Sequence, residues 1–332
     1  MTDTINRRTF LQNAAAGMLA AGLAGAVEPV EVRNGMPYRT LGKTGVKVSL
    51  LCLGGSHIGM KNLTDDESVG LMRHAVDEGV NFFDNAWAYH NGVSEERMGK
   101  ALKDGYRDRV FLMTKNKGRD AASARQHLED SLRRLDVDVI DLLQVHEVVR
   151  PGDVTSVYDK GVLDVLLKAR EQGKIRHIGV TGHHYPKFLN DMINGGFPWE
   201  SIQMPLNIFD AHFRSFQREV LPRAVEMNLG VIAMKTMGGS PATLPRTGAV
   251  TPEECLRWAM SLPVSTVCSG MDTRELLDKN LRTVKDFTPL TDTEKQGILA
   301  RALEPASSGE HEHYKTLWHR DVQRQMDEAA HG

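Results

Sequence analysis

The sequence predicts an α/β fold: a (β/α)8 TIM barrel that is preceded by a β-hairpin and followed by a C-terminal helical tail. Eight short apolar runs alternate with amphipathic stretches, and such runs are typical of strands buried on both faces of a parallel sheet. The region after residue 26 has about 300 residues, which suits one barrel. A doubly wound sheet is the alternative, but no G-x-G-x-x-G motif follows the first run.

The barrel is expected to occupy residues 36–304. It begins with a hairpin, because "MPYRTLGKTGVKVS" gives two short strand-like runs around the turn residues 42–45. The eight barrel strands are expected in the runs "LLCLGG", "VNFFDNA", "VFLMTK", "VIDLLQVH", "HIGVTGH", "SIQMPLN", "GVIAMKT" and "STVCSG".

Helices are expected between these strands. The stretch "TDDESVGLMRHAVDEGV" opens with acidic residues after Thr64 and closes at Gly79, which are typical helix ends. In "DAASARQHLEDSLRRLDVD", Leu128, Leu132 and Leu135 recur at helical spacing. Six further helices are expected near residues 97–103, 161–172, 186–194, 214–228, 252–260 and 273–284.

Residues 1–26 resemble a twin-arginine signal peptide, in which "NRRTF" precedes an apolar run. The run 14–26 is shorter than the roughly 20 residues that span a bilayer, so no stable membrane insertion is expected after cleavage. Ala24-Gly25-Ala26 supplies an A-x-A cleavage site; an uncleaved apolar helix is the alternative. We therefore expect the export machinery as a partner and a periplasmic or secreted location, or a cytoplasmic one if the signal does not function.

Composition excludes several other classes of partner. The formal charge is −2, so no basic field favours nucleic acid. The three cysteines are Cys52, Cys255 and Cys268; they form no C-x-x-C motif and are expected to be small buried residues, with no metal bound. Residues 305–332 form a polar tail, in which His311 and His313 are expected to be solvated.

Four polar residues follow three successive strands. Asp84 and Tyr89 come from "FFDNAWAYH", Lys115 from "LMTKNKG" and His146 from "LLQVHE". In a barrel these strand ends meet at one rim, where buried ionisable groups point to chemistry. A tyrosine hydroxyl titrates near 10, and an adjacent ammonium lowers that value. The four residues are therefore suited to proton transfer at a carbonyl oxygen, with His146 orienting the carbonyl.

These residues resemble the aldo/keto reductase superfamily. The stretch "FFDNAWAYHNGVSEERMGKAL" is similar to the family pattern D-x-A-x-x-Y-G-x-S-E-x-x-x-G-x-x-L, and the resemblance extends from Tyr38 to about Val284. It implies that Tyr89 is the general acid of a tetrad with Asp84, Lys115 and His146. "GVTGHH" is similar to a bacterial branch with G-x-S-G-H, although the iron–sulfur cysteines frequent in that branch are absent.

The resemblance also implies a nicotinamide cofactor, NADP by family preference with NAD as the alternative, bound without a Rossmann domain. Gln203 matches the residue that binds the carboxamide, and Thr181 can replace the serine of that site, although Gly182 cannot supply its asparagine amide. Met234 stands where relatives stack an aromatic ring, and Gly238 and Gly239 let backbone approach phosphate. Lys235 is either a pyrophosphate ligand or a solvated lysine. The cofactor-binding residues expected on these grounds are Thr181, Gln203, Met234, Lys235, Gly238, Gly270, Arg274 and Asn280.

The strand-eight segment leaves the choice of dinucleotide open. Asn280 matches the adenine-contacting asparagine, but Gly270 and Leu276 stand where NADP-preferring relatives have Lys and Arg. Arg274 or Lys279 either compensates for these charges or lies on a solvated helix face.

Histidines after several strands favour a polar, sugar-like substrate, and His90 and His183 are expected to contact it. Trp87 either offers a flat surface for a sugar ring or is a packing residue at the rim. A metal-dependent barrel hydrolase is one alternative, although it lacks the expected H-x-H motif on strand one. A cofactor-binding regulatory or sensor protein with little turnover is another. Tyr314 or Trp318 could fold back over the mouth.

Twin-arginine export carries folded cargo, and a periplasm offers no evident pool of free dinucleotide. The expected cofactor is therefore one that stays bound and is recycled in place. Tyr89 would then serve as acid in one half-reaction and as base in the other.

Overall fold

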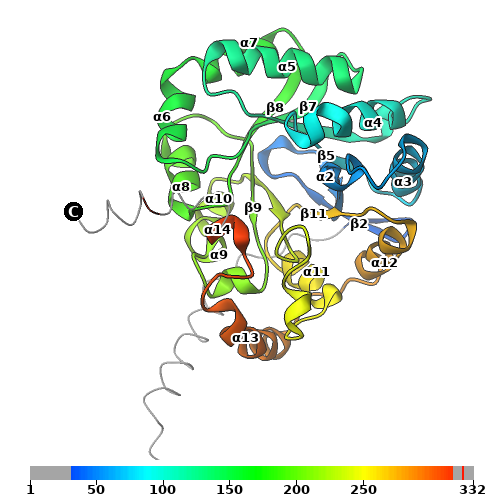
Figure 1. Ribbon diagram of the computed structural model, residues 1–332, viewed down its shortest axis with the longest axis vertical. Helices are drawn as coiled ribbons and strands as arrows, with labels where there is room; N and C mark the ends of the chain where they lie inside the picture. The colour runs from blue at the N-terminus through cyan, green and yellow to red at the C-terminus, as the bar shows by residue number, and fades with distance from the viewer. Residues whose placement is uncertain (1–30, 317–323, 325–332) are drawn as a thin grey trace, which may run out of the picture.

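The computed structural model describes residues 31–316 and residue 324 (Figure 1). The expected signal peptide, residues 1–26, and Trp318 lie outside the described residues. Of the helices in the described part, none is long and apolar enough to cross a membrane.

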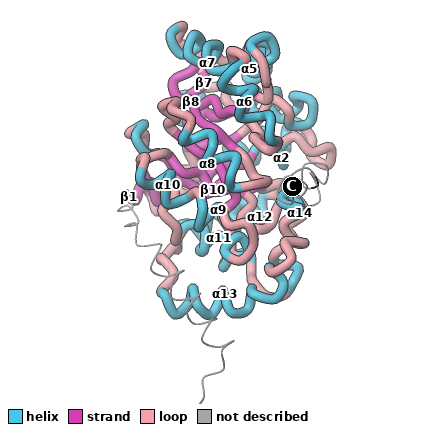
Figure 2. The backbone as a smooth tube through the Cα atoms, turned by 90° about the vertical axis from the view of Figure 1, so that its left-hand side faces the viewer, coloured by secondary structure: helices cyan, strands magenta, loops and turns pink. Residues whose placement is uncertain are grey.

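Eight parallel strands close into a barrel in the order β10-β11-β4-β5-β6-β7-β8-β9, and Figure 2 shows these strands surrounded by helices. This arrangement confirms the predicted (β/α)8 barrel. The strands are β4 (Leu51–Gly54), β5 (Phe82–Asp84), β6 (Phe111–Asn116), β7 (Ile140–Val145), β8 (Ile175–Thr181), β9 (Ser201–Pro205), β10 (Gly230–Met234) and β11 (Thr266–Gly270).

The helices are α2 (Gly55–Ile58), α3 (Asp65–Asp77), α4 (Val93–Ala101), α5 (Ala121–Leu135), α6 (Pro151–Asp159), α7 (Val162–Glu171), α8 (Pro186–Asn194), α9 (Phe216–Glu219), α10 (Leu221–Glu226), α11 (Pro252–Met260), α12 (Arg274–Lys285), α13 (Asp292–Ala306) and α14 (His313–Thr316). Thr64 caps α3 through a capping box, as its sequence predicts. The expected helix over 214–228 is instead two short helices, because Pro222 lies in the first turn of α10 and donates no backbone hydrogen bond.

The N-terminal hairpin closes one end of the barrel. Strand β1 (Glu31–Arg33) pairs with β2 (Met36–Thr40), and β2 pairs with β3 (Lys47–Ser49). From this hairpin, Leu41 and Val48 pack against the barrel interior, where Phe82 and Phe111 meet edge to face. The floor of the barrel is therefore apolar.

Alternation along the strands then places the polar groups at the opposite end. Along β6, Phe111 and Met113 belong to the interior cluster, and Lys115 follows at the same two-residue period. Along β5, Phe82 lies inside and Asp84 is the next inward residue. These two strands, β5 and β6, therefore carry apolar side chains at the floor and an ionisable one near the carboxyl end.

The C-terminal segment is partly buried, although its composition predicts a solvent-exposed polar tail. Glu312, Tyr314 and Lys315 are fully buried. The Tyr314 carbonyl lies 3.1 Å from Nδ1 of His184, which follows β8. Tyr314 therefore contacts the segment that follows β8.

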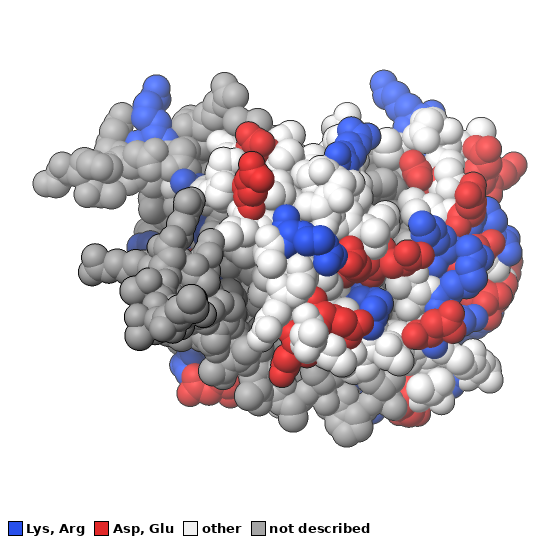
Figure 3. Space-filling view, turned by 90° about the horizontal axis from the view of Figure 1, so that it is seen from below, with Lys and Arg blue, Asp and Glu red and all other residues white. Residues whose placement is uncertain are grey.

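On the face drawn in Figure 3, acidic and basic side chains of the described residues are intermingled. Many of the surface charges pair with one another, such as Arg73 with Asp104 at 2.7 Å and Arg109 with Asp77 at 2.9 Å.

Candidate active site

The ends of β5 and β6 bring together Asp84, Lys115 and Tyr89. Lys115 is 1% exposed, and its Nζ forms an ion pair with Asp84 Oδ1 and donates to the Asn85 carbonyl at 2.8 Å. The same Nζ lies 3.3 Å from the Tyr89 hydroxyl. A buried ammonium therefore connects a carboxylate to a phenol, as the sequence predicts.

The pKa of Tyr89 is raised, whereas the sequence analysis expected the adjacent ammonium to lower it. Burial raises the pKa of Tyr89 above its ordinary value, and Lys115 opposes that effect without outweighing it. Burial lowers the pKa of Lys115, but Asp84, Tyr89 and Cys268 raise it by more, so the pKa is above its ordinary value. At neutral pH, Lys115 is therefore charged and Tyr89 is a protonated hydroxyl that is able to donate.

His146 completes the tetrad of Asp84, Tyr89, Lys115 and His146. Its ring meets the Tyr89 ring edge to face, with the centres 5.8 Å apart. Burial lowers the pKa of His146 to about 3, so the imidazole is neutral. Its Nδ1 is buried and has no hydrogen-bond partner among the described residues. A neutral imidazole can orient a substrate oxygen without adding charge.

Asp84 is held by more residues than the sequence predicts. Gln203 Nε2 donates to Asp84 Oδ2 at 2.7 Å, and the Cys268 thiol donates to the same oxygen at 3.0 Å. The contact with Cys52 raises the pKa of Cys268, and burial and the nearby Asp84 carboxylate raise it further. The sequence interpretation of Cys268 as a small buried residue missed this contact, which its inward position two residues before Gly270 would have indicated.

A cavity of about 560 Å³ opens at the carboxyl ends of the strands, and the whole tetrad lines it. Of the residues expected to bind cofactor or substrate, Thr181, His183, Met234, Lys235 and Gly270 also line it, together with His57, Gly239, Asp272 and Leu276. At Gly270 a Cβ atom would lie 1.8 Å from His57 Nδ1, so only glycine leaves that imidazole in place.

The other predicted cofactor residues lie behind or beside the cavity. Asn280 is buried and donates to Ser269 at 3.1 Å, beneath the lining. Arg274 is exposed and pairs with Asp278 along α12 at 3.2 Å. Gly238 has a φ of 88°, and a Cβ there would lie 2.1 Å from the Thr243 hydroxyl.

Two predicted substrate residues do not line the cavity. The Trp87 indole stacks on His127 with the ring centres 3.5 Å apart and donates to Asp130 at 3.1 Å, so it faces α5. This arrangement is that of a rim packing residue. His90 is exposed, and its Nε2 lies 2.7 Å from the Ser56 carbonyl.

Glu147, which the sequence analysis did not single out, lines the cavity directly after His146. Its carboxylate pairs with Lys117 at 2.8 Å. Burial raises the pKa of Glu147, but His146, His183 and Lys117 lower it by more. The pKa is therefore below its ordinary value, and the carboxylate is ionised. The sequence does contain a signal for Glu147, because this charged residue directly follows His146, which was already predicted to be functional.

The buried C-terminal segment borders the same region. Asn207 donates to the Tyr314 hydroxyl at 2.9 Å, and that hydroxyl donates to the Glu312 carboxylate. Lys315 pairs with Asp210 at 2.7 Å and with Glu312 at 3.0 Å. The Tyr314 ring lies edge to face with His183, with the centres 6.1 Å apart.

The chain is similar to known proteins in both sequence and structure. The model of the Aldo/keto reductase family matches residues 50–245, more than half of the chain. This chain belongs to the aldo/keto reductase family. The aldo-keto reductase YhdN of Bacillus subtilis is 36% identical over 203 residues, which are 57% of this chain and 58% of that protein. The L-galactose dehydrogenase of Arabidopsis thaliana is 34% identical over 154 residues, 43% of this chain and 48% of that enzyme.

The aligned part thus spans about half the length of these curated relatives. Among solved structures, an aldo-keto reductase from Bacillus halodurans in its holo form superimposes with a TM-score of 0.69 at 25% identity. That superposition covers 83% of this chain and 99% of the other. The shared architecture therefore extends well beyond the aligned sequences.

As an aldo/keto reductase, the chain is expected to hold a nicotinamide cofactor, and the residues present fit one. Gln203 Oε1 is buried and accepts no hydrogen bond from the described residues, because Nε2 of the same amide is held by Asp84. An acceptor fixed in this way suits the amino group of a carboxamide. Gln203 itself is buried behind the cavity lining, whereas Gly270 and Gly239 line the cavity without a side chain.

Among the described residues, no group of three or more His, Cys, Asp or Glu side chains is arranged to hold a metal ion.

Proposed function

We propose that this aldo/keto reductase interconverts a carbonyl and an alcohol with an NAD(P) cofactor, and that Tyr89 is its general acid and base. The observation that carries the proposal is the contact between Tyr89 and Lys115 at 3.3 Å, in a cavity that the tetrad lines. The family supports carbonyl chemistry, and the buried phenol supplies the proton that such chemistry requires.

Each residue of the tetrad has a role in this proposal. When bound, the nicotinamide supplies the hydride in one direction and accepts it in the other. Tyr89 donates its hydroxyl proton to the developing alkoxide, and Lys115 stabilises the phenolate that remains. Asp84 fixes Lys115, and the neutral His146 imidazole orients the substrate oxygen. In alcohol oxidation the Tyr89 phenolate takes the proton back.

Steady-state assays test this proposal directly. The protein is incubated with NADPH or NADH and a panel of aldehydes and ketones, and oxidation of the cofactor is followed by absorbance. Turnover that Tyr89→Phe abolishes supports the proposal. Cofactor binding without turnover across the panel would instead favour the alternative of a regulatory or sensor protein.

We propose NADP as the cofactor, with NAD as the alternative. Arg274 is exposed at the start of α12, close to the rim segment that ends in Gly270, and a guanidinium suits a phosphate. Arg274→Met is expected to raise the KM for NADPH severalfold and to leave that for NADH unchanged, whereas equal effects would contradict a contact between Arg274 and the phosphate, and a lower wild-type KM for NADH would indicate NAD.

We also propose that the protein is exported folded, through its N-terminal signal, with the cofactor already bound and recycled in place. The protein is purified from a periplasmic extract and denatured, and the supernatant is assayed for nicotinamide dinucleotide. A nearly stoichiometric yield supports retention and identifies NADP or NAD. An empty protein that binds added cofactor weakly would contradict retention, and recovery only from the cytoplasm would contradict export.

The substrate is proposed to be polar and sugar-like. Neutral and charged polar side chains surround the tetrad, among them His57, His183 and Asp272. A relative is named as an L-galactose dehydrogenase, which agrees with a hydroxyl-bearing substrate.

A further inference from the structure

Two oppositely charged residues of the cavity play no part in the chemistry just described. Glu147 follows β7 and Lys235 follows β10, and both line the cavity. Both have left-handed backbone conformations, with φ of 51° at Glu147 and 55° at Lys235. Residues other than glycine adopt this conformation rarely, and in strand-end loops it is typical of functional sites.

The backbone on the Glu147 side is held by one arginine. Arg119 Nη2 donates to the His146 carbonyl at 2.6 Å and to the Glu147 carbonyl at 2.8 Å. Its Nε pairs with Asp153 at 2.9 Å, and Asp153 in turn accepts from Val149 NH at 2.9 Å. The loop after β7 is therefore fixed, and Glu147 keeps one place at the cavity wall.

The Lys235 side is held by Asn207, which follows β9, and by Tyr314 of the buried C-terminal segment. Asn207 Nδ2 donates to the Lys235 carbonyl at 3.2 Å and to the Tyr314 hydroxyl at 2.9 Å. The Lys235 Nζ lies 5.3 Å from the centre of the Tyr314 ring, within cation–π range. Tyr314 is itself fully buried.

Burial and nearby charged groups both act on the Lys235 ammonium. Burial lowers the pKa of Lys235 to about 8, while Glu147 raises it and Lys115 lowers it further. The groups that act on this ammonium are Glu147 after β7, Lys115 in β6, Cys268 in β11 and Asp84 in β5. The Tyr314 ring that Lys235 contacts also meets the ring of His183, a cavity residue expected to bind substrate. This geometry favours contact with substrate over the pyrophosphate contact, which the sequence leaves open.

We propose that Glu147 and Lys235 are specificity-determining residues that bind hydroxyl groups of a neutral, polyhydroxylated substrate beyond its reacting carbon. A substrate hydroxyl donates to the Glu147 carboxylate, which pairs with Lys117 at 2.8 Å and can accept further hydrogen bonds. Another hydroxyl accepts from the Lys235 ammonium. Because the two charges are opposite and share one cavity, a neutral polyol satisfies both. An anionic substrate near Lys235 faces repulsion from Glu147. The inference rests on the proposed function, and it assigns substrate recognition to residues other than Trp87 and His90.

The test compares two aldehydes in the full-length protein, an aldose such as D-xylose and an apolar aldehyde such as butanal. In Glu147→Gln and Lys235→Met, the ratio of kcat/KM for the aldose over butanal is expected to fall at least tenfold, mainly through KM. Matched controls are Glu129→Gln and Lys187→Met, which alter surface residues paired with Lys174 and Asp191. The controls are expected to leave the ratio unchanged, and thermal melting checks that all four variants fold.

Other outcomes overturn the inference. An equal loss with both aldehydes indicates a role in the tetrad. A weakened affinity of Lys235→Met for NADPH, measured by fluorescence titration, with an unchanged ratio returns that lysine to the cofactor. A gain with a uronic acid in Glu147→Gln that Lys235→Met abolishes indicates an anionic substrate.

Calorimetry separates failure of the inference from failure of the proposed function. If the wild-type protein turns over no aldehyde, the proposed function fails. Aldose binding that Glu147→Gln and Lys235→Met weaken tenfold would then still support the hydroxyl-binding pair. Absence of aldose binding to the wild-type protein contradicts the pair even if butanal is reduced.

Discussion

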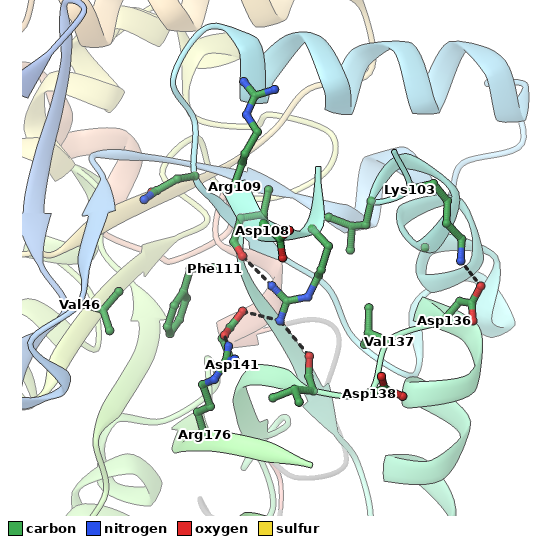
Figure 4. Close-up of a pocket in the computed structure, with 16 residues that line it drawn as sticks. Val46, Lys103, Asp108, Arg109, Phe111, Asp136, Val137, Asp138, Asp141 and Arg176 are labelled. Atoms are coloured by element: carbon green, nitrogen blue, oxygen red, sulfur yellow. Dashed lines mark hydrogen bonds and ion pairs between the residues drawn. The ribbon is translucent and has the colours of Figure 1, made fainter. Parts of the chain in front are cut away.

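Both ends of the barrel carry many charged residues, but these residues differ in how deeply they are buried and in whether their partners come from the protein alone. At the amino ends of the strands lies a hollow of about 580 Å³ (Figure 4). Its charged lining residues are Lys103, Arg107, Asp108, Arg109, Asp136, Asp138, Asp141 and Arg176. Asp141 pairs with Arg107 at 2.8 Å and also with Arg176. Arg107 further donates to the Val110 and Val139 carbonyls, each at 2.8 Å.

At the carboxyl ends, the charges are more deeply buried and leave capacity for a ligand. Lys115 and Asp84 are almost fully buried, whereas Arg107 keeps 23% of its side chain exposed. Nδ1 of His146 and Oε1 of Gln203 have no hydrogen-bond partner among the described residues. The number of charged residues therefore does not distinguish the site; deep burial combined with unused hydrogen-bonding groups does.

The largest effect is expected at the carboxyl end. Tyr89→Phe keeps the ring and removes the hydroxyl that is proposed to donate the proton. Loss of a general acid lowers kcat by about 10²–10⁴-fold. Steady-state turnover measures this loss, and thermal melting is expected to show little change. A variant that retains most of its turnover would show that the proton comes from elsewhere.

Lys115→Met tests the burial that separates the two ends. The substitution leaves the Asp84 carboxylate in a dry environment without its cation. Breaking a buried pair in this way lowers the free energy of unfolding by about 3–5 kcal/mol, measured by urea denaturation.

The double variant Asp84→Asn, Lys115→Met is the control, because it removes both charges and is expected to recover part of that stability. A single variant that loses less than about 1 kcal/mol would behave like an exposed ion pair. That outcome would remove the contrast between the two ends.

The acid sensitivity of the carboxyl end is expected to come partly from His146. Its pKa is about 3 in the folded protein, because of burial, and about 6.5 when the chain is unfolded. Between these values the unfolded state binds a proton that the folded state does not, so stability falls as the pH drops below about 6.5.

Between pH 7 and pH 5 this difference amounts to about 2 kcal/mol. Urea denaturation at the two pH values measures it. His146→Gln is expected to lose about that much less than the wild type, whereas equal losses would mean that the imidazole is already charged in the folded protein.

The barrel was predictable because its strands carry a local pattern. Short apolar runs between capped helices indicate a parallel sheet, and the strand ends then place Asp84, Lys115 and His146 at one rim. Alternation along the strands would also have indicated Cys268. These features depend on residues close together in the sequence.

The remaining features depend on contacts between distant residues. The direction of the Trp87 indole is set by α5, where Asp130 and His127 contact it. The buried pair of Lys315 with Asp210 joins residues 105 positions apart. Through this pair, part of a C-terminal segment with a polar composition is buried. Neither contact leaves a periodic signal in the sequence.

The smallest effect is expected at the amino end, and it tests the comparison most sharply. Arg107→Met removes an arginine that holds Asp141 and two carbonyl groups, but Arg176 still pairs with Asp141. We expect the free energy of unfolding to fall by about 1–2 kcal/mol, with kcat unchanged. Urea denaturation and steady-state assays on one preparation measure both quantities. If kcat falls together with stability, the two ends of the barrel are coupled, and the hollow at the amino ends is more than a set of structural ion pairs.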